Sequence, residues 1–252
     1  MQSPGSYADV NGLRMYYEIH GSGPPLLLLH ELTGSSERFR VDLPLWAQDF
    51  QVIVAEWMGH GRTADRVDRD FHYHDLAEDM VALMRHLKVD AASFVGKSAG
   101  GIIGLDMAIH HPDRLVKLAV TGSTFRVDGY DPKALEWVLT TKPEDWPRYW
   151  REAYERLSPD GPSHWPVFFE RWRRMAAVEP NYTRDQMAGI KVPTLVIVGD
   201  RDLVTPEHAV EMFRIIPGAK LCVVPGAGHR VLPTETVLAF LKEPGEPAAT
   251  HS

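Results

Sequence analysis

Gly96-Lys97-Ser98-Ala99-Gly100 is the stretch of sequence that decides the fold of this chain. It follows an apolar run that ends at Val95 and precedes a segment with helical spacing, which predicts a sharp strand-to-helix turn around Ser98. The backbone of a nucleophile in such a turn is strained by on the order of 1–3 kcal/mol, so its neighbours must be small. Gly96, Gly100 and Gly101 meet that requirement. Taken alone, the pentapeptide is equally consistent with a glycine-rich turn that has no catalytic role.

Short apolar runs on both sides of this turn predict an α/β fold with a doubly wound, mostly parallel sheet. Segments with helical spacing, at residues 76–87 and 102–109, alternate with the runs, as is typical of parallel sheets. Asn11-Gly12 favours a tight hairpin, and therefore an antiparallel edge at the start of the sheet. The predicted strands are residues 26–29, 52–55, 93–95, 118–120, 195–198 and 221–224.

Aromatic side chains become dense between residues 123 and 187, where the alternation of strand and helix breaks. We interpret this segment as a helical cap inserted over the sheet, with the core formed by residues 1–122 and 188–242. Most of the aromatics are expected to pack within the cap, and a few to face a ligand. Residues 243–252 are predicted to form a flexible tail. The aromatics of the segment include Trp137, Trp146, Tyr149, Trp150, Tyr154, Trp165, Phe168, Phe169 and Trp172.

The composition excludes several classes of partner. A chain of 252 residues with 44% hydrophobic residues can bury one sizeable core, and a formal net charge of -7 argues against binding nucleic acid. No apolar stretch approaches the length that spans a bilayer, and the first residues do not resemble a secretion signal, so a cytoplasmic location is expected. The single cysteine, Cys222, lies in an apolar run and is expected to act as a small buried hydrophobe.

Two later loops supply the partners that a nucleophilic serine needs. Gly199-Asp200-Arg201-Asp202 follows the predicted strand at 195–198, and Pro225-Gly226-Ala227-Gly228-His229 follows the strand at 221–224. The chain order serine, aspartate, histidine is typical of one arrangement of the catalytic triad. Each candidate lies just beyond the carboxyl end of a strand, where open α/β sheets bind ligands. His229 is therefore the candidate base, and either aspartate the candidate acid.

With these motifs the chain resembles the α/β-hydrolase superfamily, in its capped, esterase-like branch. Further similar segments are Leu29-His30-Glu31, Met58-Gly59-His60-Gly61-Arg62-Thr63, residues 96–106 and residues 110–115. The resemblance implies that Asp202 is the acid, leaving loop hydrogen bonding as the role of Asp200, although Asp200 stays open as the alternative. It also implies an oxyanion hole made by the backbone N–H groups of Leu32 and Ala99.

Three segments depart from the family pattern: Glu31, Lys97 and Glu56-Trp57-Met58. A carboxylate about 4 Å from the oxyanion hole would oppose its charge by roughly 4 kcal/mol at an effective dielectric constant near 20. That is as much as the roughly 2.7–4 kcal/mol that one donor contributes. Glu31 is therefore expected to point away or to pair with Lys97. Candidate substrate-pocket residues are Glu31, Lys97, Trp57, Phe125 and Trp137.

A serine hydrolase that cleaves an ester, lactone or related acyl bond of a small molecule is the first functional hypothesis. The second uses the same triad to cleave a carbon–carbon bond or to form a peracid, and the third is a ligand-binding protein with little turnover. No cofactor is predicted. His72 and His74 at a helix start, and His110-His111 at a helix end, lack partners at zinc spacing, so no metal is assigned.

Overall fold

An eight-stranded sheet forms the centre of the protein, with the strand order β1-β2-β4-β3-β5-β6-β7-β8. The computed structural model describes residues 5–244. All six predicted strands are confirmed, and each extends by at least one residue beyond its apolar run. Their bounds are β1 Ser6–Val10, β2 Leu13–His20, β3 Pro25–Leu29, β4 Gln51–Glu56, β5 Ala92–Lys97, β6 Leu115–Thr121, β7 Thr194–Arg201 and β8 Lys220–Gly228.

The antiparallel edge arises from the predicted hairpin. Asn11 and Gly12 both have positive φ angles, of 49° and 75°, which join β1 to β2 in a tight turn. Strand β2 also pairs antiparallel with β4, whereas β3 to β8 are paired in parallel. The sheet is therefore mostly parallel, and the carboxyl ends of its parallel strands meet along one edge.

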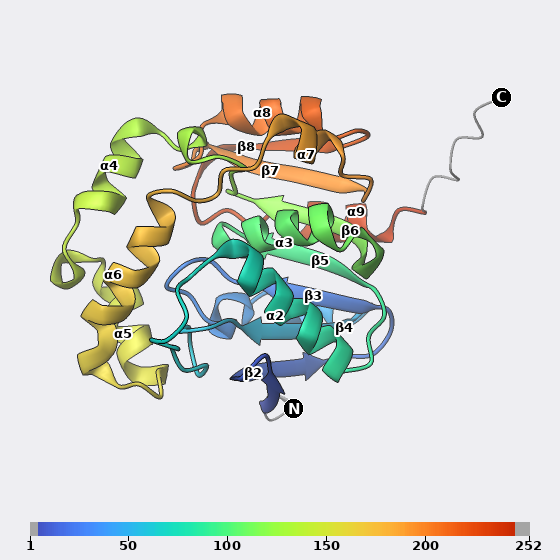
Figure 1. The fold of residues 1–252 in the computed structure, drawn as a ribbon. Coiled ribbons are helices and arrows are strands. Elements are labelled where there is room, and N and C mark those ends of the chain that lie inside the picture. The colour runs from blue at the N-terminus through green and yellow to red at the C-terminus, as the bar shows by residue number, and fades with distance from the viewer. Residues whose placement is uncertain (1–4, 245–252) are drawn as a thin grey trace.

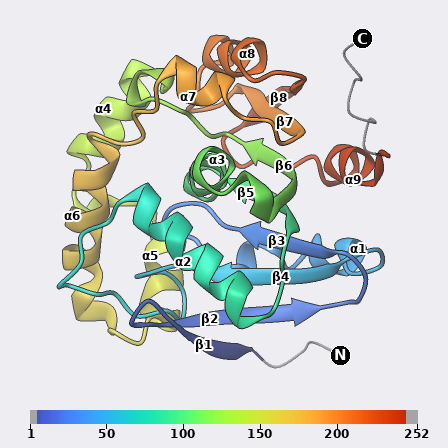
Figure 2. The same ribbon diagram turned by 45° about the vertical axis from the view of Figure 1, so that its right-hand side comes forward.

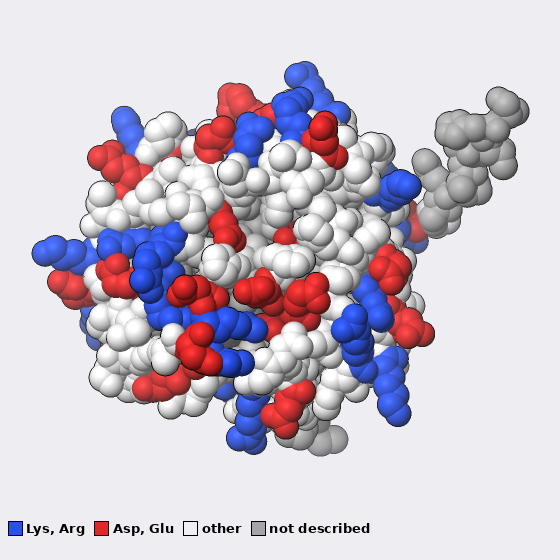
Figure 3. All heavy atoms as spheres, viewed as in Figure 1, with Lys and Arg blue, Asp and Glu red and all other residues white. Residues whose placement is uncertain are grey.

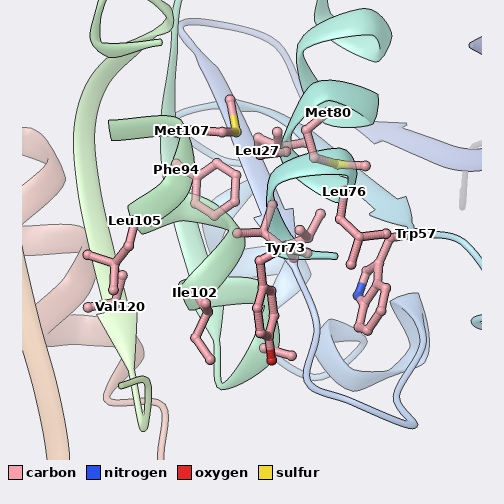
Figure 4. Close-up of a cluster of buried hydrophobic side chains, with 14 of the residues drawn as sticks. Leu27, Trp57, Tyr73, Leu76, Met80, Phe94, Ile102, Leu105, Met107 and Val120 are labelled. Carbon is pink, nitrogen blue, oxygen red and sulfur yellow. The ribbon is translucent and has the colours of Figure 1, made fainter. Parts of the chain in front are cut away.

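Helices cover both faces of the sheet (Figures 1 and 2). Alternate side chains of β3 enter two separate cores, with Leu27 and Leu29 on one face and Leu26 and Leu28 on the other. Figure 4 shows the first core, where side chains of α2 and α3 pack against those of the strands. The helices are α1 Leu43–Trp46, α2 Tyr73–His86, α3 Ala99–His110, α4 Pro132–Thr140, α5 Arg148–Leu157, α6 Trp165–Ala176, α7 Arg184–Ala188, α8 Pro206–Ile215 and α9 Thr234–Lys242.

Helices α4, α5, α6 and α7 lie between β6 and β7. Apart from the last residue of α7, they belong to the segment that we call the helical insertion (residues 123–187). Figures 1 and 2 show α4, α5 and α6 standing beside the sheet at the end to which its parallel strands point. Most of the aromatics in this segment are buried, as predicted; Trp137 and Tyr149 are exposed. Ion pairs fasten the insertion to the core, including Arg156 to Glu37 at 2.6 Å and Arg171 to Asp65 at 3.1 Å.

No helix within residues 5–244 has the length and apolar character required to cross a membrane. Residues 245–252 of the predicted tail lie outside the described part of the chain. Cys222 is only partly buried, because β8 is an edge strand, and burial raises the pKa of its thiol. The expectation of a buried cysteine is therefore confirmed only in part: Cys222 packs against the second core but stays partly exposed.

Candidate active site

Ser98 occupies a strained turn between β5 and α3. Its φ and ψ angles are 51° and −119°, in a region that side-chain-bearing residues rarely adopt. The turn requires glycine on both sides. A Cβ atom on Gly96 would lie 2.4 Å from the carbonyl oxygen of Gly100, and one on Gly100 would lie 2.4 Å from the carbonyl oxygen of Leu29. The strain that the sequence predicts is thus present in the backbone.

The three distant loops bring Ser98, His229 and Asp202 into one hydrogen-bonded chain. His229 Nε2 lies 2.9 Å from Ser98 Oγ, and His229 Nδ1 lies 2.6 Å from Asp202 Oδ1. Asp200, the alternative acid, is an exposed residue near the end of β7 and makes neither of these contacts. An imidazole that donates from Nδ1 to a carboxylate presents its Nε2 lone pair to the serine hydroxyl. The arrangement can therefore deprotonate Ser98 as it attacks an electrophile.

Asp202 is held as an anion by its surroundings. Burial raises its pKa, but hydrogen bonds from His229 and from the backbone N–H groups of Val204 and Gly199 outweigh that effect and lower the pKa overall. The Asp202 side chain is fully buried, whereas that of His229 is 19% exposed. A buried anion beside the imidazole favours the imidazolium that forms when Ser98 loses its proton.

Gly122 is a residue of the site that the sequence reasoning missed. It follows β6 with a φ angle of 59°, and a Cβ atom there would lie 3.1 Å from both Asp202 Oδ2 and His229 Nδ1. A side chain there would press against this hydrogen bond, and the positive φ angle also favours glycine. A glycine two residues beyond the predicted strand 118–120, at the same edge as Ser98, was the available signal.

The predicted oxyanion hole consists of the backbone N–H groups of Leu32 and Ala99. Both residues line the cavity that contains Ser98. Within residues 5–244, neither N–H group donates a hydrogen bond to another protein atom. Ala99 is the first residue of α3, so its N–H group has no acceptor within the helix. Two free donors beside a nucleophile can bind a negatively charged oxygen.

A largely apolar cavity of about 100 Å³ opens above Ser98 and His229. Its floor comes from the loops of the core, and much of its wall comes from α4 and neighbouring parts of the helical insertion. Glu31 and Trp137 line it, as do Tyr73 and Tyr130, which the sequence reasoning did not single out. The other lining residues are Thr33, Ala134, Leu135, Val138, Trp146, Trp150, Ala176 and Leu203.

Trp57 and Phe125, which the sequence placed in the pocket, do not line this cavity. Both side chains are fully buried. The ring of Trp57 packs against His30 and His60, with centroids 5.6 and 3.4 Å away. Phe125 stacks on His208 with the centroids 4.6 Å apart. Both rings pack in the core and not in the cavity wall. The prediction that Trp57 and Phe125 line the substrate pocket was therefore wrong.

The predicted ion pair between Glu31 and Lys97 is not formed. Glu31 Oε1 instead lies 3.6 Å from Arg38 Nε, so a neighbouring guanidinium offsets the carboxylate near the oxyanion hole. Lys97 does not line the cavity either. Its Nζ donates a hydrogen bond to the backbone carbonyl of His229. Lys97 thus supports the loop that carries the imidazole, from the position directly before the nucleophile.

The third departure, Glu56-Trp57-Met58, belongs to the framework beneath the site. Glu56 is completely buried, pairs with Arg62 at 2.8 Å and accepts a hydrogen bond of 3.0 Å from the backbone N–H of Ser36. A Cβ atom on Gly61 would lie 2.2 Å from the carboxyl carbon of Glu56, so this position requires glycine. The unusual glutamate therefore anchors two loops and does not face the cavity.

Burial of Lys97 predicts a specific dependence of stability on pH. Desolvation lowers its pKa from an ordinary value of 10.5 to about 8. Between these values the unfolded chain binds a proton that the folded chain has lost, so the contribution of Lys97 to the unfolding free energy rises with pH. The difference corresponds to about 3 kcal/mol. Relative to Lys97→Met, the wild type should gain that much stability between pH 8 and 10.5, as measured by urea unfolding.

Lys191→Met provides the matched control, because Lys191 is exposed, in contrast to the buried Lys97. The unfolding free energy of the Lys191→Met variant should change with pH as that of the wild type does across the same range. A constant difference between wild type and Lys97→Met would contradict the burial of a charged lysine at this position.

Comparisons with known proteins place these observations in a family context. The family model described as alpha/beta hydrolase fold matches residues 24–160. A putative carbamate hydrolase RutD from Serratia proteamaculans is 26% identical over 244 residues, covering 88% of this chain and 91% of that protein. The serine hydrolase BPHL from Homo sapiens is 28% identical over 235 residues, covering 88% of this chain and 79% of that protein.

A solved structure extends the similarity to three dimensions. The crystal structure of an enol-lactonase from Burkholderia xenovorans LB400 superposes with a TM-score of 0.76 at 26% identity. The match covers 94% of this chain and 100% of the enol-lactonase chain. It therefore extends over nearly the whole chain, including most of the helical insertion.

Proposed function

Because this chain belongs to the alpha/beta hydrolase fold family and is a hydrolase, we propose that it cleaves a carboxylic ester or lactone through an acyl-enzyme on Ser98. The observation that carries the proposal is the continuous hydrogen-bonded chain from Ser98 Oγ through His229 to Asp202, with distances of 2.9 and 2.6 Å. It lies at the base of an apolar cavity beside two free N–H donors.

In the first half-reaction, Ser98 Oγ attacks the carbonyl carbon while His229 Nε2 removes the hydroxyl proton. The carbonyl oxygen becomes an oxyanion, which accepts hydrogen bonds from the N–H groups of Leu32 and Ala99. As the tetrahedral intermediate collapses, His229 passes its proton to the leaving oxygen. The products are an acyl-enzyme and a free alcohol, or, from a lactone, an acyl chain that retains its hydroxyl group.

In the second half-reaction, water repeats the attack on the acyl-enzyme. His229 takes a proton from the water as it bonds to the acyl carbon, and returns it to Ser98 Oγ when the ester bond breaks. Throughout both steps Asp202 fixes the imidazole tautomer and stabilises its cationic form. The acid leaves, and the triad regains its starting protonation.

The cavity and the relatives support a small acyl substrate. A cavity of about 100 Å³ with Trp137, Trp146 and Trp150 in its wall favours a compact apolar acyl group. The similar enol-lactonase and the putative carbamate hydrolase are both named for carbonyl compounds in which a heteroatom leaves. The proposed alpha/beta hydrolase reaction on an ester or lactone belongs to the same chemical class.

A panel of p-nitrophenyl acetate, butanoate and octanoate, together with a simple lactone, tests the proposal. With these activated esters we expect a rapid release of nitrophenol equal to the enzyme concentration, followed by slower steady turnover, because acylation precedes deacylation. Intact mass of the quenched reaction should show one acyl group. The octanoate should be the poorest ester, since the cavity is small.

Labelling with a fluorophosphonate separates the other hypotheses. A protein that forms one adduct on Ser98 yet hydrolyses neither esters nor lactones would move the proposal to carbon–carbon bond cleavage or peracid formation. A protein that forms no adduct would have an unactivated serine, and a ligand-binding role would replace catalysis.

A further inference from the structure

We propose that His74, Asp106 and His110 form a binding site for one divalent transition-metal ion of the zinc class. A ligand atom from each of these residues lies within 4.8 Å of the other two. His74 is in the first turn of α2, whereas Asp106 and His110 are four residues apart on α3. Two imidazoles and one carboxylate are a donor set that zinc accepts, with solvent as the fourth ligand.

The distances within the cluster are close to those that a metal would require. His74 Nδ1 lies 3.0 Å from Asp106 Oδ1, and His110 Nε2 lies 3.9 Å from Asp106 Oδ2. In a tetrahedral zinc site with bonds of about 2.0–2.1 Å, ligand atoms are roughly 3.4 Å apart. Small rotations of the two half-exposed imidazoles would bring all three donors to that spacing.

Asp106 has the surroundings of a ligand more than those of a surface carboxylate. Its side chain is 2% exposed, whereas those of His74 and His110 are 53% and 38% exposed. The hydroxyl of Tyr182 donates a hydrogen bond of 2.9 Å to Asp106 Oδ2 and so fixes the direction of the carboxylate. Such outer partners commonly orient metal ligands.

The local charge favours a cation. The pocket that contains the cluster is also lined by Asp75 and Glu179. Figure 3 shows acidic side chains gathered on this face, over α2. Glu179 pairs with His72 at 2.6 Å. The carboxylate of Asp106 faces His74 and His110. A divalent ion would therefore enter a site of negative potential that is open to solvent.

The site would stabilise the fold and take no part in bond cleavage. Asp106 lies eight residues beyond Ser98, or roughly 12 Å along a helix that rises 1.5 Å per residue. A bound ion would join α2 to α3 and, through Tyr182, to the last part of the helical insertion. Tyr73, which lines the active-site cavity, is the residue directly before His74.

Sequence spacing alone could not reveal this cluster. His72 and His74 on one helix, and His110 and His111 on the other, gave no zinc pattern within either pair. The structure combines one histidine of each pair and adds Asp106, which is 32 residues from His74. The prediction that the chain binds no metal is revised by this proposal.

Isothermal titration of the purified full-length chain with Zn²⁺, after treatment with a chelator, tests the site. We expect one equivalent to bind with a Kd below about 10 μM, and the melting temperature to rise on binding. The double variant His74→Gln/His110→Gln should lose this equivalent and the rise in melting temperature. Both side chains are substantially exposed, so the variant should fold.

His111→Gln is the matched control, because His111 adjoins His110 but pairs with Glu78 instead. It should bind Zn²⁺ within threefold of the wild type. The proposal is overturned if the wild type binds no Zn²⁺ below 100 μM, or if the double variant binds as tightly as His111→Gln. Ester hydrolysis is not a readout here, so the outcome is independent of the proposed reaction.

Discussion

Replacing Ser98 with alanine is expected to lower kcat/KM for p-nitrophenyl butanoate by roughly 10⁴- to 10⁶-fold. The variant retains the cavity and the free N–H groups of Leu32 and Ala99, but it lacks the oxygen that lies 2.9 Å from His229 Nε2. Any residual rate would come from the oxyanion hole and from substrate binding. Steady-state kinetics, combined with fluorophosphonate labelling, would measure both the loss of turnover and the loss of the adduct.

Ser163→Ala is the control for this experiment, because Ser163 is exposed on the helical insertion and away from the cavity. It should keep wild-type kinetics and wild-type labelling. Turnover by Ser98→Ala within tenfold of the wild type would show that the reaction does not proceed through a covalent intermediate on this residue.

Asp202→Asn is expected to lower kcat by about 10⁴-fold with little change in KM. The amide preserves the shape of the side chain but carries no negative charge. It therefore cannot hold the Nδ1–H tautomer as the carboxylate does, whose Oδ1 lies 2.6 Å from His229 Nδ1. The imidazole would then favour the tautomer that places its proton towards Ser98. Stopped-flow measurement of the nitrophenol burst would show whether acylation itself is slowed.

Asp200→Asn is the matched control, since it makes the same chemical change two residues earlier, near the end of β7. The Asp200 side chain is exposed and does not contact His229, so activity should stay within about threefold of the wild type. If the large loss appeared in Asp200→Asn instead, the acid would be the alternative that the sequence left open.

The fold could be predicted because its signals are local. Apolar runs, helical spacing and the glycines around Ser98 are each contained in a short window, and the order of strands and helices then limits the topology. The candidate base His229 and the loop of the candidate acid followed from the same logic, whereas the choice of Asp202 over Asp200 came from the family resemblance. Loops that leave neighbouring parallel strands at one edge must meet there, whatever the distance in sequence.

Side-chain directions in the site could not be predicted in this way. Trp57 and Phe125 each come shortly after a strand, which is why the sequence placed them at the active site. Their rings instead pack against His30 and His208, respectively, and do not line the cavity. Glu31 pairs with Arg38, which lies in the following 3₁₀ helix (Ser36–Phe39). Lys97 instead donates a hydrogen bond to the backbone carbonyl of His229. These choices depend on tertiary contacts among several loops, which a single sequence does not display.

The origin of the cavity walls has a consequence for how such an enzyme can diversify. Every group that would perform bond-making and proton transfer comes from the loops at the sheet edge, whereas α4 and its neighbours supply much of the surface that a substrate touches. Selection or design can therefore remodel the insertion to admit new compounds while the reactive machinery stays intact. Changes in substrate range and changes in reaction type are, in this architecture, separable evolutionary events.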